Sequence, residues 1–338
     1  MARPFVETGI RGRVVDDTGP DMITSVANTS SETLKTFTSI LVDVDATATA
    51  QPALERAADI ARKCGASLRI VDVMSALAEG RRGLRPDLDD ELMARRRERL
   101  ARLAYGFRDV VTESDVLAGM PADALIETVE RFGHDLLVRS HTRDVAARGP
   151  KPFGPVDVQL FRRCPCPVWA VGAGAQPEHP RVVAAIDVST VDPVKQALNR
   201  RMIELALLLT RLQEGSLILL HAWQPLAEKR VATHASDEEY SAYLDSSRNS
   251  AKDDLVALAR TFGSRLAGAQ PELRRGTIEE VLPEFVVAEG IDLVVIGTMG
   301  RTGIARHLMR NTADWLLDRL LCSVVAVKPA RTAASVKA

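Results

Sequence analysis

The residues best suited to bind a ligand are three glycines spaced three residues apart, Gly297, Gly300 and Gly303. An apolar run, residues 293–296, precedes them, and a segment with the pattern of a helix, residues 304–321, follows them. A short apolar run bounded by turn residues predicts a buried parallel strand. Glycines after such a strand let a ligand approach the main chain, and the N-terminus of the next helix offers free N–H groups to an anion.

The spacing of these glycines does not match two common phosphate-binding motifs. No Lys-Ser or Lys-Thr pair completes the pattern G-x-x-x-x-G-K-[ST]. Two residues separate Gly297 from Gly300, which also excludes G-x-G-x-x-G. The alternative is that the glycines only form a tight turn, and the sequence leaves both interpretations open.

Composition narrows the class of protein. A chain of 338 residues suggests two domains, and its hydrophobic fraction of 46% and charged fraction of 26% are ordinary for a globular protein. The formal net charge of -1 gives no basic field for nucleic acid or an anionic membrane. The four cysteines are too few for a disulfide framework, and Cys164-Pro165-Cys166 lacks the spacing of a zinc site.

The N-terminal residues 1–35 are rich in polar residues and contain no apolar core of signal-peptide length. We expect them to form a flexible arm outside the fold. No run of 18 apolar residues occurs in the chain, so we expect a cytoplasmic protein without a membrane span.

Strands alternate with helices, which predicts parallel sheets covered by helices. The predicted strands include residues 40–45, 68–73, 136–138, 168–171, 182–187 and 216–222. The same order occurs twice. Gly119 precedes Asp135 by 16 residues, and Gly276 precedes Asp292 by the same 16 residues. We therefore expect two copies of one unit, joined through the glycine-rich residues 172–177.

The repeated unit resembles the universal stress protein domain, and the chain resembles the tandem, two-domain type over about residues 36–329. The segments that carry the resemblance are residues 183–187, 217–222, 292–313 and 322–329. The resemblance implies an α/β fold with two doubly wound, five-stranded parallel sheets of strand order 3-2-1-4-5, like that of adenine nucleotide alpha hydrolases. The expected domains are residues 36–173 and 179–329, with a tail at 330–338.

Nucleotide-binding members of that family carry G-x-x-G, nine further residues, and then Gly-Ser or Gly-Thr. Gly297 and Gly300 match the first part, but Arg310 and Asn311 stand where the second glycine and the hydroxyl residue belong. The bulk of the Arg310 side chain argues against a phosphate bound close to the main chain, whereas its charge and N–H donors favour phosphate binding. If ATP binds, the resemblance implies contacts of the ribose with Asp187, of adenine with the main chain of Ala222, and of the phosphates with Gly297, Gly300, Arg310, Asn311 and Thr312.

The first half lacks the glycine loop. Ser140 and Arg143 replace the two glycines, and Pro152 and Pro155 remove main-chain donors before the last helix. We expect this half to be structural or to bind something else. His141 and Arg143 could contact an anion, but polar residues at a loop tip need no ligand to explain them.

Other candidate residues have simpler explanations. His221 ends an apolar strand and is expected in the core or in a crevice wall rather than on a metal. His307 and its neighbouring arginines form either an anion site or a solvated helix face, and Trp315 is expected in a core or an interface. No nucleophile–base pair or metal set occurs, so we predict a binding protein without catalysis, or alternatively a scaffold or carrier of an apolar molecule.

The last strand of each half, residues 168–171 and 324–327, is apolar, and the resemblance places it at a sheet edge. An exposed apolar edge favours aggregation unless it is covered. We expect the two halves to cover each other in an intramolecular pseudo-dimer, and a further homodimer is left open.

Overall fold

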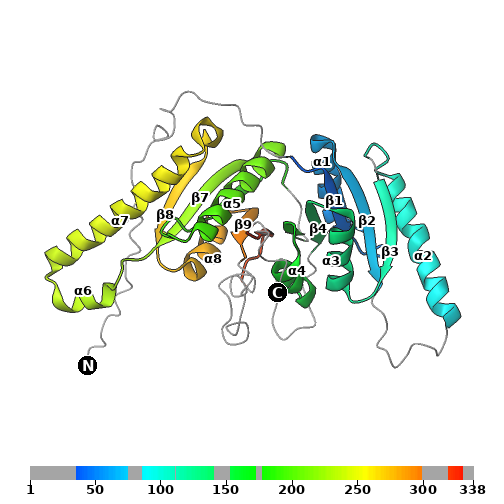
Figure 1. Ribbon diagram of the computed structural model, residues 1–338, viewed down its shortest axis with the longest axis horizontal. Coiled ribbons are helices and arrows are strands. Elements are labelled where there is room, and N and C mark those ends of the chain that lie inside the picture. The colour runs from blue at the N-terminus through cyan, green and yellow to red at the C-terminus, as the bar shows by residue number, and fades with distance from the viewer. Residues whose placement is uncertain are drawn as a thin grey trace, which may run out of the picture.

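The two halves of the chain form one continuous sheet (Figure 1). The computed structural model describes residues 36–74, 86–110, 112–140, 153–172, 177–298 and 319–329. Across the ten-stranded sheet the order is β3-β2-β1-β4-β5-β10-β9-β6-β7-β8. Each half therefore has the predicted order 3-2-1-4-5, and all neighbours within a half are parallel.

The strands are short, and the central ones are mostly apolar because helices cover both faces of the sheet. The first half contains β1 (Ser39–Asp43), β2 (Ser67–Met74), β3 (Thr112–Ala118), β4 (Leu136–Ser140) and β5 (Val168–Val171). The second contains β6 (Arg181–Ala185), β7 (Ser216–Trp223), β8 (Gln270–Arg275), β9 (Leu293–Gly297) and β10 (Ser323–Val327).

Some of the helices begin at side-chain caps. Ser236 and Thr277 each form a capping box, and Asp192 accepts a hydrogen bond from Val194 N–H at the start of α5. The helices of the first half are α1 (Pro52–Cys64), α2 (Pro86–Tyr105), α3 (Pro121–Phe132) and α4 (Pro155–Arg163). Those of the second are α5 (Pro193–Leu212), α6 (Glu228–His234), α7 (Asp237–Arg260), the 3-10 turn η2 (Gly263–Leu266) and α8 (Ile278–Ala288).

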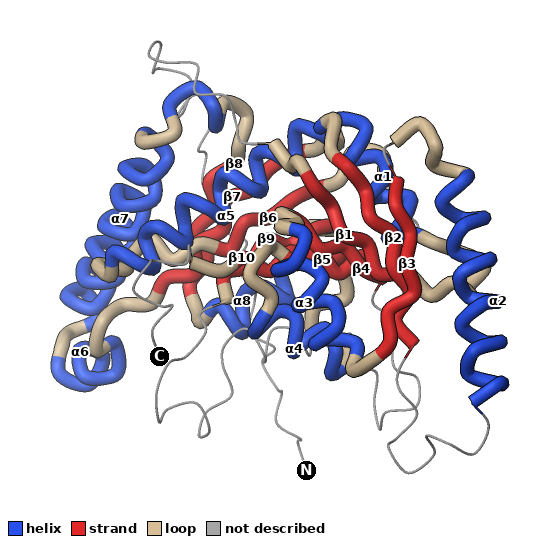
Figure 2. Tube along the Cα trace, turned by 45° about the vertical axis from the view of Figure 1, so that its right-hand side comes forward, coloured by secondary structure: helices blue, strands red, loops and turns tan. Residues whose placement is uncertain are grey.

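The helices form a layer on each side of the sheet (Figure 2). Apolar residues of α1, α2, α5 and α7 share one core with the sheet, and those of α3, α4 and α8 share the other. Because both cores run through the two halves, the halves are packed together and not merely tethered. Among the described residues, no helix has both the length and the apolar character that a membrane crossing needs.

The halves meet at a seam, where β5 and β10 pair antiparallel. Trp169 lies opposite Val325, Val168 opposite Ala326, and Ala170 opposite Val324. In the sequence repeat, Trp169 and Val325 are equivalent positions, so this register places a pseudo-twofold axis between them. The structure thus confirms the predicted pairing of the last strands.

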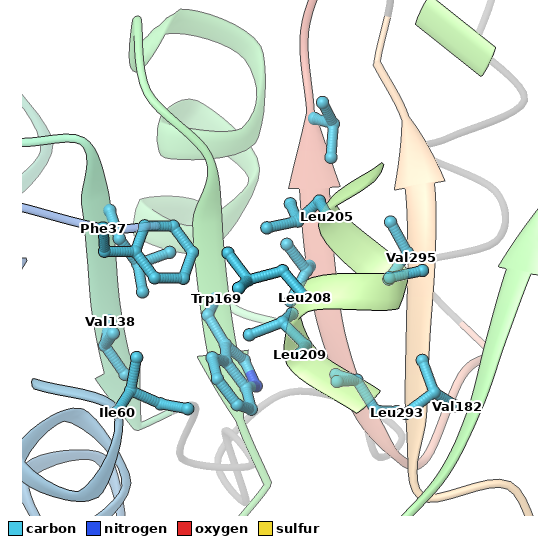
Figure 3. Close-up of a cluster of buried hydrophobic side chains, with 14 of the residues drawn as sticks. Phe37, Ile60, Val138, Trp169, Val182, Leu205, Leu208, Leu209, Leu293 and Val295 are labelled. Atoms are coloured by element: carbon cyan, nitrogen blue, oxygen red, sulfur yellow. The ribbon is translucent and has the colours of Figure 1, made fainter. Parts of the chain in front are cut away.

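Trp169 joins the two halves in the larger core (Figure 3). Its ring lies between Ile60 and Val138 of the first half and Leu208 and Leu209 of α5, and it is 1% exposed. An aromatic ring of this size contributes much of the apolar area that such a seam buries.

Some predicted boundaries are wrong by a few residues. β1 ends at Asp43 rather than at residue 45, and β6 ends at Ala185 rather than at residue 187. Of the helix predicted at 304–321, residues up to 318 lie outside the described part of the chain, and residues 319–321 are not helical. The expected arm at 1–35 also lies outside it.

Candidate functional site

The carboxyl ends of β6 and β9 lie side by side at the centre of the second half. From β6 the chain crosses to β7 on one side, and from β9 it continues to β10 on the other. The strand order therefore reverses between β6 and β9, and parallel sheets bind ligands at such switch points. The structure brings Asp187, Ala222 and Gly297 to this edge of the sheet, and we call the edge the switch crevice because ligands of such folds bind there.

Asp187 follows β6 and is exposed. Its main chain is held by the buried Asn199 of α5, whose Oδ1 accepts from Asp187 N at 3.2 Å and whose Nδ2 donates to Asp187 O at 2.6 Å. Carboxylate oxygen Oδ1 accepts from Ser189 Oγ at 2.6 Å and from Ser189 N at 3.2 Å. Oδ2 has no hydrogen-bond partner among the described residues, so it is available to a ligand hydroxyl.

The peptide groups of Ala222 face the switch crevice. The Leu220 carbonyl accepts from Ile186 N–H beyond the end of β6, and the Trp223 carbonyl accepts from Gly276 N–H on the opposite side of β7. Because successive peptide groups of a strand point to opposite edges, those of Ala222 point toward β6, which ends at Ala185. An N–H and a carbonyl are thus presented beside Asp187.

His221 is a buried residue of β7 next to the switch crevice. It is 3% exposed, and its Nδ1 lies 3.1 Å from Ile186 O. A carbonyl only accepts, so Nδ1 carries the proton and Nε2 is the acceptor. Burial lowers the pKa of His221, and the neutral form fits this arrangement. The prediction of a core or crevice-wall histidine is confirmed.

Gly297 ends β9 beneath helix α5. A Cβ at this position would lie 2.7 Å from Leu198 Cδ2 and 2.9 Å from Met202 Sδ, both closer than real Cβ contacts. A side chain here would displace the ends of Leu198 and Met202, so helix packing alone favours a glycine. The sequence suggested a ligand or a tight turn, and neither interpretation identified this close helix–strand approach.

The remaining predicted ligand residues cannot be placed. Gly300, Arg310, Asn311 and Thr312 lie outside the described residues, and so do the other candidates His141, Arg143, His307 and Trp315. The phosphate part of the predicted site therefore rests on the sequence.

The family model described as "Universal stress protein family" matches residues 36–172 and again residues 180–328. The two matches cover most of the chain and coincide with the two five-stranded units of the sheet. The chain belongs to the universal stress protein family.

Two relatives named for universal stress protein E are similar in length to this chain. Universal stress protein E of Photorhabdus laumondii is 28% identical over 305 residues, which are 87% of this chain and 95% of that protein. The universal stress protein E homolog of Haemophilus influenzae is 32% identical over 211 residues, which are 62% of this chain and 67% of that protein.

Solved structures show the same fold. A Pseudomonas aeruginosa protein described as functionally unknown superposes with a TM-score of 0.61 at 22% identity, covering 87% of this chain and 93% of its own. A universal stress protein of Archaeoglobus fulgidus superposes with a TM-score of 0.60 at 15% identity, covering 86% of this chain and 96% of its own. At these identities the likeness concerns the fold alone.

The first domain of this universal stress protein repeats the acid turn of the second. Asp45 Oδ1 accepts from Thr47 Oγ1 at 2.6 Å and from Thr47 N at 2.8 Å, as Asp187 does from Ser189. The turn is therefore a property of the repeated unit, and the acid by itself does not distinguish a binding domain from a structural one. At the end of β4, the Ser140 hydroxyl accepts from Ala53 N–H at 3.3 Å, where the second domain has Gly297.

A buried charge cluster distinguishes the first domain, and sequence analysis missed it. Arg139 of β4 lies 3.1 Å from Asp157 of α4 and 3.6 Å from Asp43 of β1 (Nε to carboxylate oxygen). Burial raises the pKa of Asp43 to about 6, although Arg139 opposes the shift. The equivalent strand positions of the second domain are Ala185 and Ile296, so charged residues within apolar strands were the available signal.

Proposed function

We propose that this protein is a stress-response binding protein whose second domain holds an adenine nucleotide, ATP, in the switch crevice. The observation that carries the proposal is that two groups lie at the same edge of the sheet. They are Oδ2 of Asp187, which has no hydrogen-bond partner among the described residues, and the N–H and carbonyl of Ala222, which point toward β6. A carboxylate suits the ribose hydroxyls, and an N–H beside a carbonyl suits the edge of adenine. Asn199 fixes the main chain that presents the acid.

The phosphates are assigned from the sequence motif. In the proposal they lie against Gly297 and Gly300, with Arg310, Asn311 and Thr312 supplying the donors that Gly-Ser or Gly-Thr supplies in nucleotide-binding members of the family. A guanidinium pairs well with phosphate oxygens. No general base is assigned, so the proposed role is binding without hydrolysis, and release of inorganic phosphate from ATP over hours measures any departure from it.

Isothermal titration calorimetry with MgATP tests the ribose contact. Asp187→Asn should weaken binding about tenfold, a loss of about 1.4 kcal/mol. Asp45→Asn is the matched control, because it alters the same turn in the first domain and should leave the affinity unchanged. Equal effects of the two substitutions, or no heat of binding by the intact wild-type protein, would refute the proposal.

Restoring the family motif tests the phosphate contact. The double substitution Arg310→Gly and Asn311→Ser recreates G-x-x-G, nine residues, and Gly-Ser. If Arg310 supplies a phosphate contact, the double variant binds MgATP more weakly. Tighter binding would show instead that Arg310 hinders the nucleotide.

One observation favours a second candidate function, a scaffold or carrier that binds no nucleotide. The contact of Gly297 with Leu198 and Met202 explains this glycine without any phosphate. A folded wild-type protein that gives no heat of binding with MgATP in the calorimeter would support this alternative.

A further inference from the structure

A cavity of about 820 Å³ lies between the two domains, and its lining residues do not include Asp187, Ala222 or Gly297. We call it the seam cavity. Its volume falls within the roughly 300–1,000 Å³ that is typical of small-molecule sites. The first domain contributes Phe37, Val129 and Cys166 to its walls, and α5 of the second domain contributes Arg201, Leu205 and Leu208.

The walls of the seam cavity offer an apolar surface next to a cation. Phe37, Leu205 and Leu208 belong to the larger core, and each is less than one-tenth exposed. Arg201, Leu205 and Leu208 are four and three residues apart on α5, so they form one stripe along the same helix face. A ligand lying along this stripe would meet a guanidinium at one end and leucines at the other.

Arg201 is partly buried and lacks a carboxylate partner within ion-pair distance among the described residues. Its Nη1 donates to Lys328 O at 2.6 Å, which uses one of five N–H donors. Burial lowers the pKa of Arg201, and the charge of Glu204, an exposed residue that also lines the cavity, opposes the shift. A partly desolvated cation without an anionic partner is unfavourable, and a bound anion would remove that cost.

Two acids of the first domain line the cavity: Glu130, which is exposed, and Asp135, which is already engaged. The Asp135 carboxylate accepts from Thr38 N and Oγ1 at 2.8 Å and from Ser39 N at 3.2 Å, which anchors the amino end of β1. It therefore does not serve as the partner of Arg201.

We propose that the seam cavity binds a small amphiphilic carboxylate, with its head group on Arg201 and its alkyl or aryl body against Leu205, Leu208 and Phe37. Such a ligand touches both domains, so its binding stabilises the seam by linkage. This site is separate from the proposed nucleotide site and does not depend on it.

Calorimetry with decanoate, below its aggregation concentration, tests the head group. Arg201→Gln should weaken decanoate binding about tenfold, as expected for loss of a charge-assisted contact. Arg200→Gln is the matched control, because Arg200 is the preceding residue of α5 and is exposed. Decanol should bind wild type about tenfold more weakly than decanoate for the same reason. Equal affinities in either comparison would overturn the assignment of the anion to Arg201.

Two further measurements test the location. Saturating MgATP should leave decanoate affinity unchanged, and competition would overturn the proposal of a separate site. A decanoate that carries a photoreactive diazirine should label α5 around Leu205 and Leu208, or Phe37, as mapped by mass spectrometry. Labelling confined to other elements, or no binding of decanoate by the wild-type protein, would also overturn the proposal.

Discussion

At the scale of single residues, packing favours Gly297 whether or not a nucleotide binds beside it. Any side chain there would meet Leu198 and Met202 on the helix that covers β9. The first domain has Ser140 at the equivalent position, so its helix α1 accommodates a side chain that the second domain does not. The same family position therefore has different physical requirements in the two domains.

Gly297→Ala should destabilise the protein by about 1–3 kcal/mol, because an added methyl group overpacks the contact with α5. Urea unfolding followed by circular dichroism measures the change. Gly154→Ala is the control: among the described residues, a Cβ there would have only Asp157 Oδ2 within 4 Å, at an ordinary 3.7 Å, so its effect should be smaller. Combining Gly297→Ala with Leu198→Ala should cost less than the sum of the two single changes, and strict additivity would contradict the predicted clash.

Asp43 makes stability depend on pH. Burial raises its folded-state pKa to about 6 from an ordinary value of 3.8, so the folded protein holds this proton more tightly than the unfolded chain does. The stabilisation is complete below pH 3.8 and is lost as pH rises through 6. It amounts to at most about 3 kcal/mol, given 1.36 kcal/mol for each pKa unit.

Asp43→Asn should remove this dependence, because the amide is neutral at every pH. As the pH rises from 4.5 to 7, the free energy of unfolding of the variant should therefore increase relative to that of the wild type. Urea unfolding of both proteins at the two pH values measures the difference. Stability curves that stay parallel across this range would contradict the prediction.

At the scale of elements, the C-terminal end of α4 is completed by the other domain. Thr298, directly after β9, donates its hydroxyl to Phe161 O at 3.0 Å, and Lys328, directly after β10, donates its ammonium to Cys164 O at 2.8 Å. The last carbonyls of a helix have no partners within it, and a cation there also interacts favourably with the helix dipole. Docking of the second domain therefore provides hydrogen bonds that α4 cannot form alone.

Thr298→Val should destabilise the protein by about 1–2 kcal/mol, because it keeps the shape but leaves the buried Phe161 carbonyl without this donor. Thr298→Ser retains the hydroxyl and should recover most of the hydrogen-bond contribution. Thermal and urea unfolding of both variants provide the comparison. If the Thr298→Val variant proved as stable as the wild-type protein, the hydrogen bond from Thr298 to α4 would contribute nothing to stability.

At the scale of the whole molecule, the pseudo-twofold seam covers the apolar strands and leaves polar strands at the two edges of the sheet. β3 is mostly exposed and includes Glu113 and Asp115, and β8 includes Glu272 and Arg275. Charged residues on an edge strand oppose the addition of a further strand. Pairing β5 with β10 within one chain thus puts the aggregation-prone strands in the middle.

Trp169 should account for much of the stability of the seam. Trp169→Ala should cost about 3–5 kcal/mol, the usual range for removing a buried aromatic side chain. Because Trp169 Nε1 has no hydrogen-bond partner among the described residues, Trp169→Phe loses volume but no such hydrogen bond and should cost much less. Urea unfolding of the full chain tests the comparison, and equal losses for the two variants would contradict it.

The sequence by itself determined the element order, the duplication, the strand order implied by the family resemblance, and helix starts such as Ser236. These features rest on local signals: apolar periodicity, capping residues and glycines at turns act within a few residues of themselves. The same signals placed Asp187, Ala222 and Gly297 at strand ends, and parallel topology brought those ends to one edge.

Only the tertiary structure decided what these positions contact. Helix α5 packs closely on Gly297, Arg139 lies within ion-pair distance of Asp43 and Asp157, and Arg201 lines a cavity between the domains. These contacts depend on how the helices pack on the sheet. Strand periodicity specifies which face a side chain occupies but not its neighbour across the layer. Burial and close contact come from segments far apart in the chain, so they follow from the assembled fold and not from any one stretch of sequence.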